Sequence, residues 1–242
     1  MVHAWMPGAH RVPIQHEGTV PRGGAPRVVW GTTESDPLTV TAVQAAERLV
    51  GQTHHAHLVW NPHTGDIAQL LPATTAVTEQ LVSPNQVDRG RDGRLCLLID
   101  VVGFSSLPFT QGPLLGRAAL LTWLDTWRVP RSWPAGTPVR TPAKLARGQT
   151  TEFTWAQGGH FGRSQFPGST AASPGAIAPE VLLGQVDAST RPYRARGSGI
   201  ARPPGAIPDP MLEHPPDPSR VLERPPECGT PGHSIVAEPA AV

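Results

Sequence analysis

The chain has little cysteine, little net charge and no long apolar run, and each shortage excludes a class of protein. Only Cys96 and Cys228 occur in 242 residues, too few for a disulfide framework or for a metal site built on paired cysteines. The net charge of +1 gives no electrostatic basis for binding nucleic acid or an anionic membrane. No stretch approaches the roughly 18 consecutive apolar residues of a membrane span.

The N-terminal segment also lacks the features of a targeting sequence. Residues 1–11 contain no apolar core of the kind found in secretory signal peptides. We therefore expect a chain that is made in the cytoplasm, with no signal peptide and no transmembrane segment. If it acts outside a cell, another route must take it there.

Proline and glycine are abundant, with 29 and 25 residues, and they are unevenly distributed. Their distribution predicts an irregular N-terminal arm (1–26), a globular domain (27–187) and a Pro-rich extended C-terminal tail (188–242). The tail buries too few apolar groups to build a core of its own. We expect it to lie over a partner, with a disordered linker as the alternative.

Between these segments the pattern alternates strands and helices. Residues 28–32 form a short apolar run, and Asp36-Pro37 then has the residue types that begin a helix, which Gly51 ends. The other expected elements are a hairpin (57–60 with 67–71), a central strand (95–103), a second helix (114–127) and a third helix that starts near Pro179. This order predicts an α/β fold with a single mixed β-sheet flanked by helices.

Five short strings occur in a familiar order along the domain. They are Trp30-Gly31-Thr32-Thr33-Glu34, the hairpin 57–70, Ile99-Asp100-Val101-Val102-Gly103-Phe104, Trp133-Pro134-Ala135-Gly136 and Gly158-Gly159-His160-Phe161-Gly162. Together they resemble the N-acetylmuramoyl-L-alanine amidases and peptidoglycan recognition proteins over residues ~27–187. The forms of actinobacteria and their phages are the most similar.

The resemblance implies a zinc site that this sequence does not complete. A catalytic zinc takes three protein ligands and one water, whose pKa the metal lowers. At the positions of the family's ligands this chain has Gly31, Arg163 and Ser173. A glycine offers no donor atom, and arginine carries a permanent positive charge. We therefore expect no cofactor, no bound metal and no catalytic residue there, only the former ligand positions.

Several other side chains are candidates for a cleft beside those positions. Glu34 and Asp100 have the chemistry of general bases, although paired or solvated carboxylates are the simpler interpretation. The histidines at 54, 55, 57 and 160 form a weak alternative ligand set. The residues that we expect to line a ligand-binding cleft are Glu34, His57, Trp155, His160, Phe161 and Arg163.

Three functions follow as hypotheses. The first is a catalytically inactive amidase-fold domain that serves as a structural or interaction component of an assembly, such as a phage virion or tail-like particle. Its partners would be neighbouring subunits, contacted through both arms, with no role for nucleic acid or membrane. The second is a non-catalytic peptidoglycan-binding module. The third is an active zinc amidase that takes its ligands from elsewhere.

Overall fold

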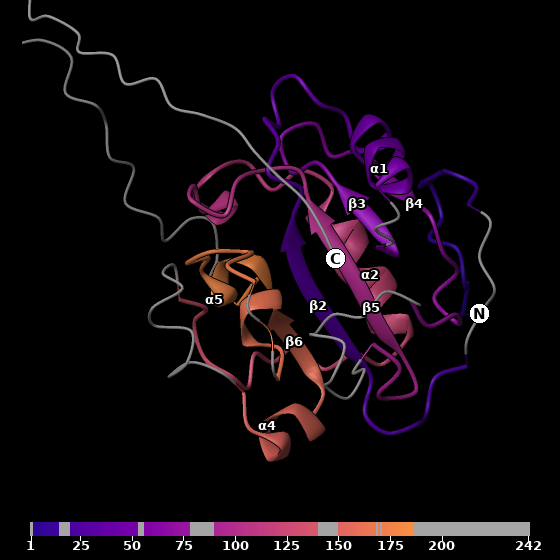
Figure 1. The fold of residues 1–242 in the computed structure, drawn as a ribbon, viewed down its shortest axis with the longest axis vertical. Coiled ribbons are helices and arrows are strands. Elements are labelled where there is room, and N and C mark those ends of the chain that lie inside the picture. Colours follow the sequence, from indigo (N-terminus) through magenta and orange to yellow (C-terminus); the bar gives the residue numbers. More distant parts are fainter. Residues whose placement is uncertain are drawn as a thin grey trace, which may run out of the picture. The chain divides into compact units, whose positions relative to one another are not determined.

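A single mixed β-sheet of six strands organises the fold in the computed structural model, which confirms the predicted α/β class (Figure 1). The strand order is β1-β4-β3-β5-β2-β6. Only β3 and β4 pair antiparallel; the other neighbours are parallel. The strands are β1 (His10–Arg11), β2 (Arg27–Thr32), β3 (Leu58–Trp60), β4 (Ile67–Gln69), β5 (Cys96–Val101) and β6 (Gly159–Gly162).

Four α-helices and two short 3-10 turns complete the described part of the chain. The helices are α1 (Ala42–Gly51), α2 (Arg117–Thr126), α4 (Glu152–Ala156) and α5 (Pro179–Leu182), and the turns are η1 (Phe109–Gln111) and η2 (Arg163–Gln165). The structure describes residues 2–14, 20–52, 56–77, 90–139, 150–167, 169 and 171–185. The expected Pro-rich tail, 188–242, lies outside the described residues. Within the described ranges no helix is long and apolar enough to cross a membrane.

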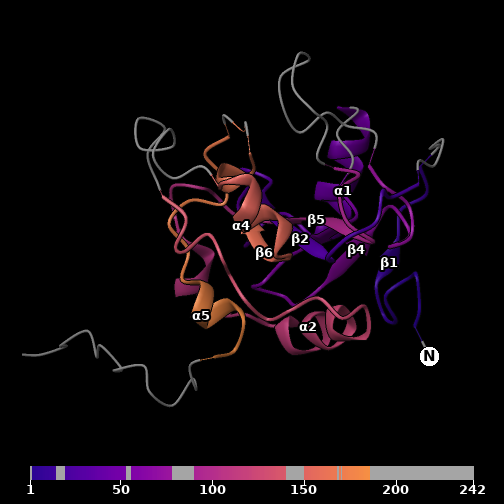
Figure 2. The same ribbon diagram turned by 90° about the horizontal axis from the view of Figure 1, so that it is seen from below.

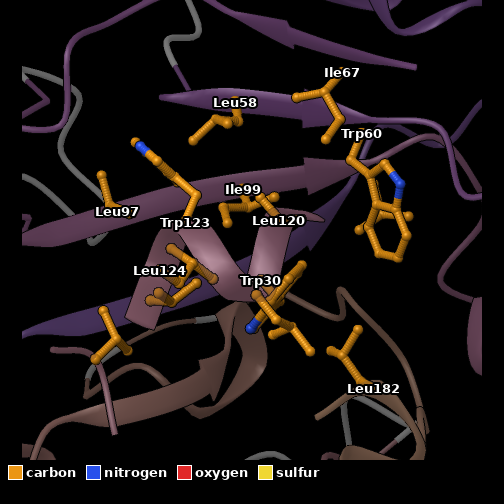
Figure 3. Packing of buried hydrophobic residues seen from close by; sticks show 14 of the residues in the cluster. Trp30, Leu58, Trp60, Ile67, Leu97, Ile99, Leu120, Trp123, Leu124 and Leu182 are labelled. Atoms are coloured by element: carbon orange, nitrogen blue, oxygen red, sulfur yellow. The ribbon is translucent and has the colours of Figure 1, made fainter. Parts of the chain in front are cut away.

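The sheet is buried on both faces because helices cover both sides of it, and successive side chains of each strand point to opposite faces. Val28 and Trp30 of β2 join the cluster beneath α2 and α5, whereas Val29 joins the cluster beneath α1. Figure 2 shows α1 on one side of the sheet and α2 and α5 on the other. On the α2 side, indole and leucine side chains fill the space between sheet and helix (Figure 3).

Helix α1 begins later than the sequence predicts. Asp36 accepts hydrogen bonds from Leu38 N and Thr39 Oγ1, so it stabilises a separate turn. The helix begins after Thr41, whose hydroxyl accepts from Gln44 N while the Gln44 side chain accepts from Thr41 N. This reciprocal capping box stabilises the first turn of a helix. The prediction of Asp36 as the N-cap is therefore wrong, whereas the end at Gly51 is confirmed.

The described part of the N-terminal leader, residues 2–14 and 20–26, is irregular except for a two-residue strand and one isolated bridge at Gly23. Residues His10–Arg11 form β1, which pairs in parallel with β4 at the edge of the sheet. Met6 and Val12 are buried in the two cores. The compact unit of the chain, Met1–Pro192, includes the leader. Edge pairing and two apolar anchors therefore hold this largely irregular leader against its own domain.

Gln69 attaches this leader to the sheet. Its buried side chain accepts from Met6 N at 2.6 Å and donates to Ala4 O at 3.0 Å and Leu71 O at 2.8 Å. We expect Gln69→Ala to lower the free energy of unfolding by about 2 kcal/mol, because buried backbone groups lose their partners. Denaturant unfolding measures this change. Gln185→Ala, which removes an exposed contact to Arg131 O, is the control and should change little. An equal effect of both substitutions would contradict this role for Gln69.

Candidate functional site

The candidate site lies where the parallel strands β2 and β5 end. Gly31 and Asp100 are direct neighbours across the two strands, and both belong to the face that α1 covers. A Cβ atom on Gly31 would lie 2.1 Å from Asp100 Oδ1 and 3.7 Å from Ser173 Oγ. The Asp100 carboxylate thus occupies the space that a side chain at position 31 would need.

Arg163 reaches the same carboxylate from the end of β6, the neighbour of β2 on its other side. It follows β6, which pairs in parallel with β2, and its Nη1 lies 4.0 Å from Asp100 Oδ1. The side chains are 16% and 5% exposed, respectively. Ser164 N donates to Ser173 O at 2.7 Å, which joins the segment of Arg163 to that of Ser173. The structure therefore places Arg163 beside Asp100 and Ser173 beside Gly31, so that these positions lie close together.

This group of residues does not fit a zinc ion. Among its four members only Asp100 has a side chain of the type that binds zinc, whereas Ser173 contributes a neutral hydroxyl and Gly31 no donor. The guanidinium of Arg163 places a positive charge beside the carboxylate, where it would repel a metal cation. Across the described ranges, no cluster of three or more His, Cys, Asp or Glu side chains is arranged to hold a metal.

Glu34 lies just beyond β2 and holds two loops together. Its backbone adopts a left-handed conformation with φ of 51°, which is uncommon for a residue with a side chain. The carboxylate accepts from Ser105 N at 3.0 and 3.2 Å and from Thr32 Oγ1 at 2.6 Å. Ser105 in turn packs against Gly175, since a Cβ there would lie 1.9 Å from Ser105 O. Glu34 is exposed at the edge of the site and can also contact a ligand.

His57 is a structural residue and does not line a cleft. It is fully buried, and both ring nitrogens have partners within the fold. Its Nδ1 accepts from Leu98 N at 3.0 Å, so Nε2 carries the proton and donates to Thr75 O at 2.7 Å. The expectation that His57 binds a ligand is therefore wrong. The neighbouring histidines at 54 and 55, part of the alternative metal set, lie outside the described residues.

His160 is buried as well, on the opposite face of the sheet. It stacks between Trp30 and Trp133, with ring centroids 5.9 and 6.3 Å away, and its Nδ1 accepts from Trp30 Nε1 at 3.0 Å. Burial, together with the nearby charge of Arg131, lowers the pKa of His160 from its ordinary value of 6.5 to about 3. The neutral ring belongs to the core, which corrects the expectation of a cleft position.

This pKa shift predicts a dependence of stability on pH. The unfolded chain binds a proton at His160 below pH 6.5, whereas the folded chain does so only near pH 3. Stability is therefore lost as the pH falls through this window, by up to about 1.4 kcal/mol per unit for one group. We expect His160→Gln to flatten the curve of unfolding free energy between pH 6.5 and 3. Urea titrations along a pH series measure it, and an unchanged slope in the variant would contradict the assignment.

Trp155 and Phe161 fill the core beneath the α1 face. They are 2% and 0% exposed, their ring centroids are 4.8 Å apart, and Phe166 packs edge-on against Trp155. Arg27 covers the other side of the indole, 4.8 Å from its centroid. Neither ring is accessible for stacking on a sugar, so the expectation that both line a cleft is wrong. The apolar pattern around them is the signal that favours this core position.

In the sequence comparisons, no protein-family model and no curated protein matches the chain. Comparisons of structure find distant likenesses. The chain is 12% identical to the Staphylococcus aureus hydrolase AmiA (TM-score 0.46, covering 74% of this chain and 81% of that one). It is 15% identical to the Ph2119 endolysin from Thermus scotoductus MAT2119 bacteriophage Ph2119 (TM-score 0.38, covering 69% and 88%).

A third likeness is to the N-acetylmuramoyl-L-alanine amidase LysCS, an endolysin from Clostridium intestinale URNW. It has 12% identity and a TM-score of 0.38, and the match covers 75% of this chain and 97% of that one. TM-scores below 0.5 at such identities establish neither membership of a family nor an activity. The function therefore has to be argued from the residues of the site.

Proposed function

We propose that this chain is a catalytically inactive amidase-like domain that acts as a structural or interaction component of an assembly. The observation that carries the proposal is that Gly31 and Arg163 both lie against the carboxylate of Asp100, with Ser173 beside Gly31. These three positions are the ones that the sequence resemblance assigns to the ligands of a zinc amidase. The ion pair between Arg163 and Asp100 supports this proposal, because it lies among the positions that the resemblance assigns to the metal ligands.

The chemistry of the site supports inactivity. Amide hydrolysis by such an enzyme needs a metal that lowers the pKa of a bound water and polarises the scissile carbonyl. The guanidinium of Arg163 cannot bind water as a metal does or take a proton from it, because it stays protonated in proteins. Asp100 could act as a base, but it is buried beside that cation.

The test of inactivity is digestion of purified peptidoglycan by the full chain in buffer that contains zinc. We expect no release of free stem peptide above the level of a heat-denatured control. Release that a chelator abolishes would contradict the proposal and support the third hypothesis, an active zinc amidase.

The role in an assembly needs a separate test, because inactivity alone does not establish it. A phage virion or tail-like particle is the assembly that we propose, since such particles carry domains directed at peptidoglycan. Density-gradient sedimentation of lysate from cells that produce the chain natively should place it in a particle fraction. A chain found only as a free monomer would count against this role.

One observation favours a second candidate, a non-catalytic peptidoglycan-binding module. The Arg163 side chain retains 16% exposure at the end of the parallel strands, where it can reach a carboxylate of a bound peptide. Purified cell wall should then retain the chain in a pull-down, and Arg163→Ala should release it. If the wall retains neither the parent chain nor the variant, this candidate fails.

A further inference from the structure

A small apolar pocket lies beside the candidate site, at the carboxyl end of β5. Its volume is about 180 Å³, and its walls come from three loops: residues 37, 62–63 and 102–113. Pocket volumes for whole cofactors or drug-sized ligands are larger, roughly 300–1,000 Å³. This pocket therefore fits a single side chain rather than a complete small molecule.

Exposed apolar side chains gather around this pocket. Leu107, a lining residue, is 66% exposed, and Leu38, which follows the lining residue Pro37, is 73% exposed. Leu115 is 52% exposed, and its backbone N–H donates to the carbonyl of Pro62 in the pocket wall. Such a concentration of exposed apolar groups is typical of a surface that binds another protein.

The pocket is also preorganised. Four of its lining residues are prolines, Pro37, Pro62, Pro108 and Pro113, whose rings fix the backbone φ angle. Glu34 holds the 104–107 loop in place through Ser105 N, and Thr110 Oγ1 of η1 accepts from Ala178 N. Rigid walls lower the entropy lost on binding, so even a small contact can contribute affinity.

The charged residues that are close in sequence to the pocket lining are acidic. The lining contains no Asp, Glu, Lys or Arg, and every residue of these four types within three sequence positions of a lining residue is an Asp or a Glu. Of these, Asp100 is buried beside Arg163. Glu34, Asp36 and Asp66 lie nearer the surface, and within the described ranges the hydrogen bonds that their carboxylates accept come from neutral donors.

We propose that this pocket binds one apolar side chain of a partner polypeptide that carries a Lys or Arg next to it. The apolar side chain fills the cavity between the prolines, and the adjacent cation lies over the acidic rim. This inference rests on the proposed interaction role and names the surface and the chemistry of the partner. The surface is distinct from the Asp100–Arg163 pair and from the N-terminal leader.

Short capped peptides test the proposal on the full chain. Acetyl-Leu-Arg-amide should cause saturable shifts of the Gly103 and Gly112 amide signals in nitrogen–proton correlation spectra. Acetyl-Leu-Glu-amide should bind about two- to five-fold more weakly, the range of a surface charge effect. Acetyl-Ser-Arg-amide should not saturate. Equal affinity for the Arg and Glu peptides, or no saturable shift with acetyl-Leu-Arg-amide, would overturn the proposal.

Two substitutions separate the cavity from its rim. Gly103→Val fills the pocket and should abolish binding; the fold should tolerate it, since a Cβ there meets only Phe109 Cβ at 3.9 Å. Asp36→Asn keeps an acceptor for the turn but removes a charge, so it should reduce the preference for Arg over Glu. Unchanged peptide binding by a folded Gly103→Val chain would refute the proposal that the pocket binds the apolar side chain. A failure here leaves the zinc and peptidoglycan results unaffected, so the two proposals fail separately.

Discussion

Arg163→Ala is expected to lower the free energy of unfolding by about 3 kcal/mol. The substitution removes the guanidinium that lies 4.0 Å from Asp100 Oδ1, while the carboxylate stays buried. Removing one member of a buried ion pair typically costs about 3–5 kcal/mol, because the remaining charge is poorly solvated. We expect the lower end of this range, since Arg163 is partly exposed and the contact is long. Urea-induced unfolding at neutral pH measures the effect.

An exposed ion pair on the same molecule provides the control. Arg131 donates to both carboxylate oxygens of Asp125, at 2.9 and 2.5 Å, yet the two side chains are 41% and 43% exposed. Solvent screening reduces such a pair to about 0–1 kcal/mol, so Arg131→Ala should have little effect despite the shorter distances. If Arg163→Ala destabilises the fold no more than Arg131→Ala does, the claim that buried Asp100 needs the charge of Arg163 is contradicted.

Gly31→Ala should be similarly costly, by about 3 kcal/mol. The new methyl group would lie 2.1 Å from Asp100 Oδ1, so the carboxylate must rotate away from its position beside Arg163. The cost combines overpacking, about 1–3 kcal/mol, with the weakened ion pair. Denaturant titrations of the variant and the parent measure the difference. Gly51→Ala, at a site with nothing within 4 Å, is the matched control and should be near neutral.

The steric conflict between a side chain at position 31 and the Asp100 carboxylate should disappear when Asp100 is replaced by alanine. Gly31→Ala combined with Asp100→Ala is expected to be more stable than the sum of the two single changes predicts, which is a coupling that a double-mutant cycle isolates. The same reasoning applies to a restored zinc site. A histidine at position 31 competes with Asp100 for space, so substitutions at 31, 163 and 173 also require a change at 100. Simple additivity of the two alanine changes would contradict this account.

Much of the fold could be predicted from local pattern. The apolar run of β2, the turn residues between β3 and β4 and the continuous apolar run of β5 are each a local sequence signal for the corresponding element. The beginning of α1 was missed because two competing caps stand five residues apart, Asp36 and Thr41, and only the second forms the capping box. Strand β1 has two residues and depends on pairing with β4, so no local signal predicts it.

The candidate site could be predicted only in part. The sequence resemblance selects Gly31, Arg163 and Ser173, and the structure places all three together. It could not show that Asp100 occupies their centre, because this depends on the register of β2 against β5. Burial of His57, His160, Trp155 and Phe161 was also missed. A histidine or tryptophan near a site can line a cleft or fill a core, and only tertiary packing distinguishes the two.

We propose that an ion pair, and not a metal, fills this site. The most direct test is the zinc content of the purified full chain after exposure to excess zinc and removal of free metal, measured by elemental mass spectrometry. The account predicts a zinc content near zero, because a glycine, a guanidinium and an alcohol surround a single carboxylate. One zinc per chain would contradict it and would return an active amidase to first place.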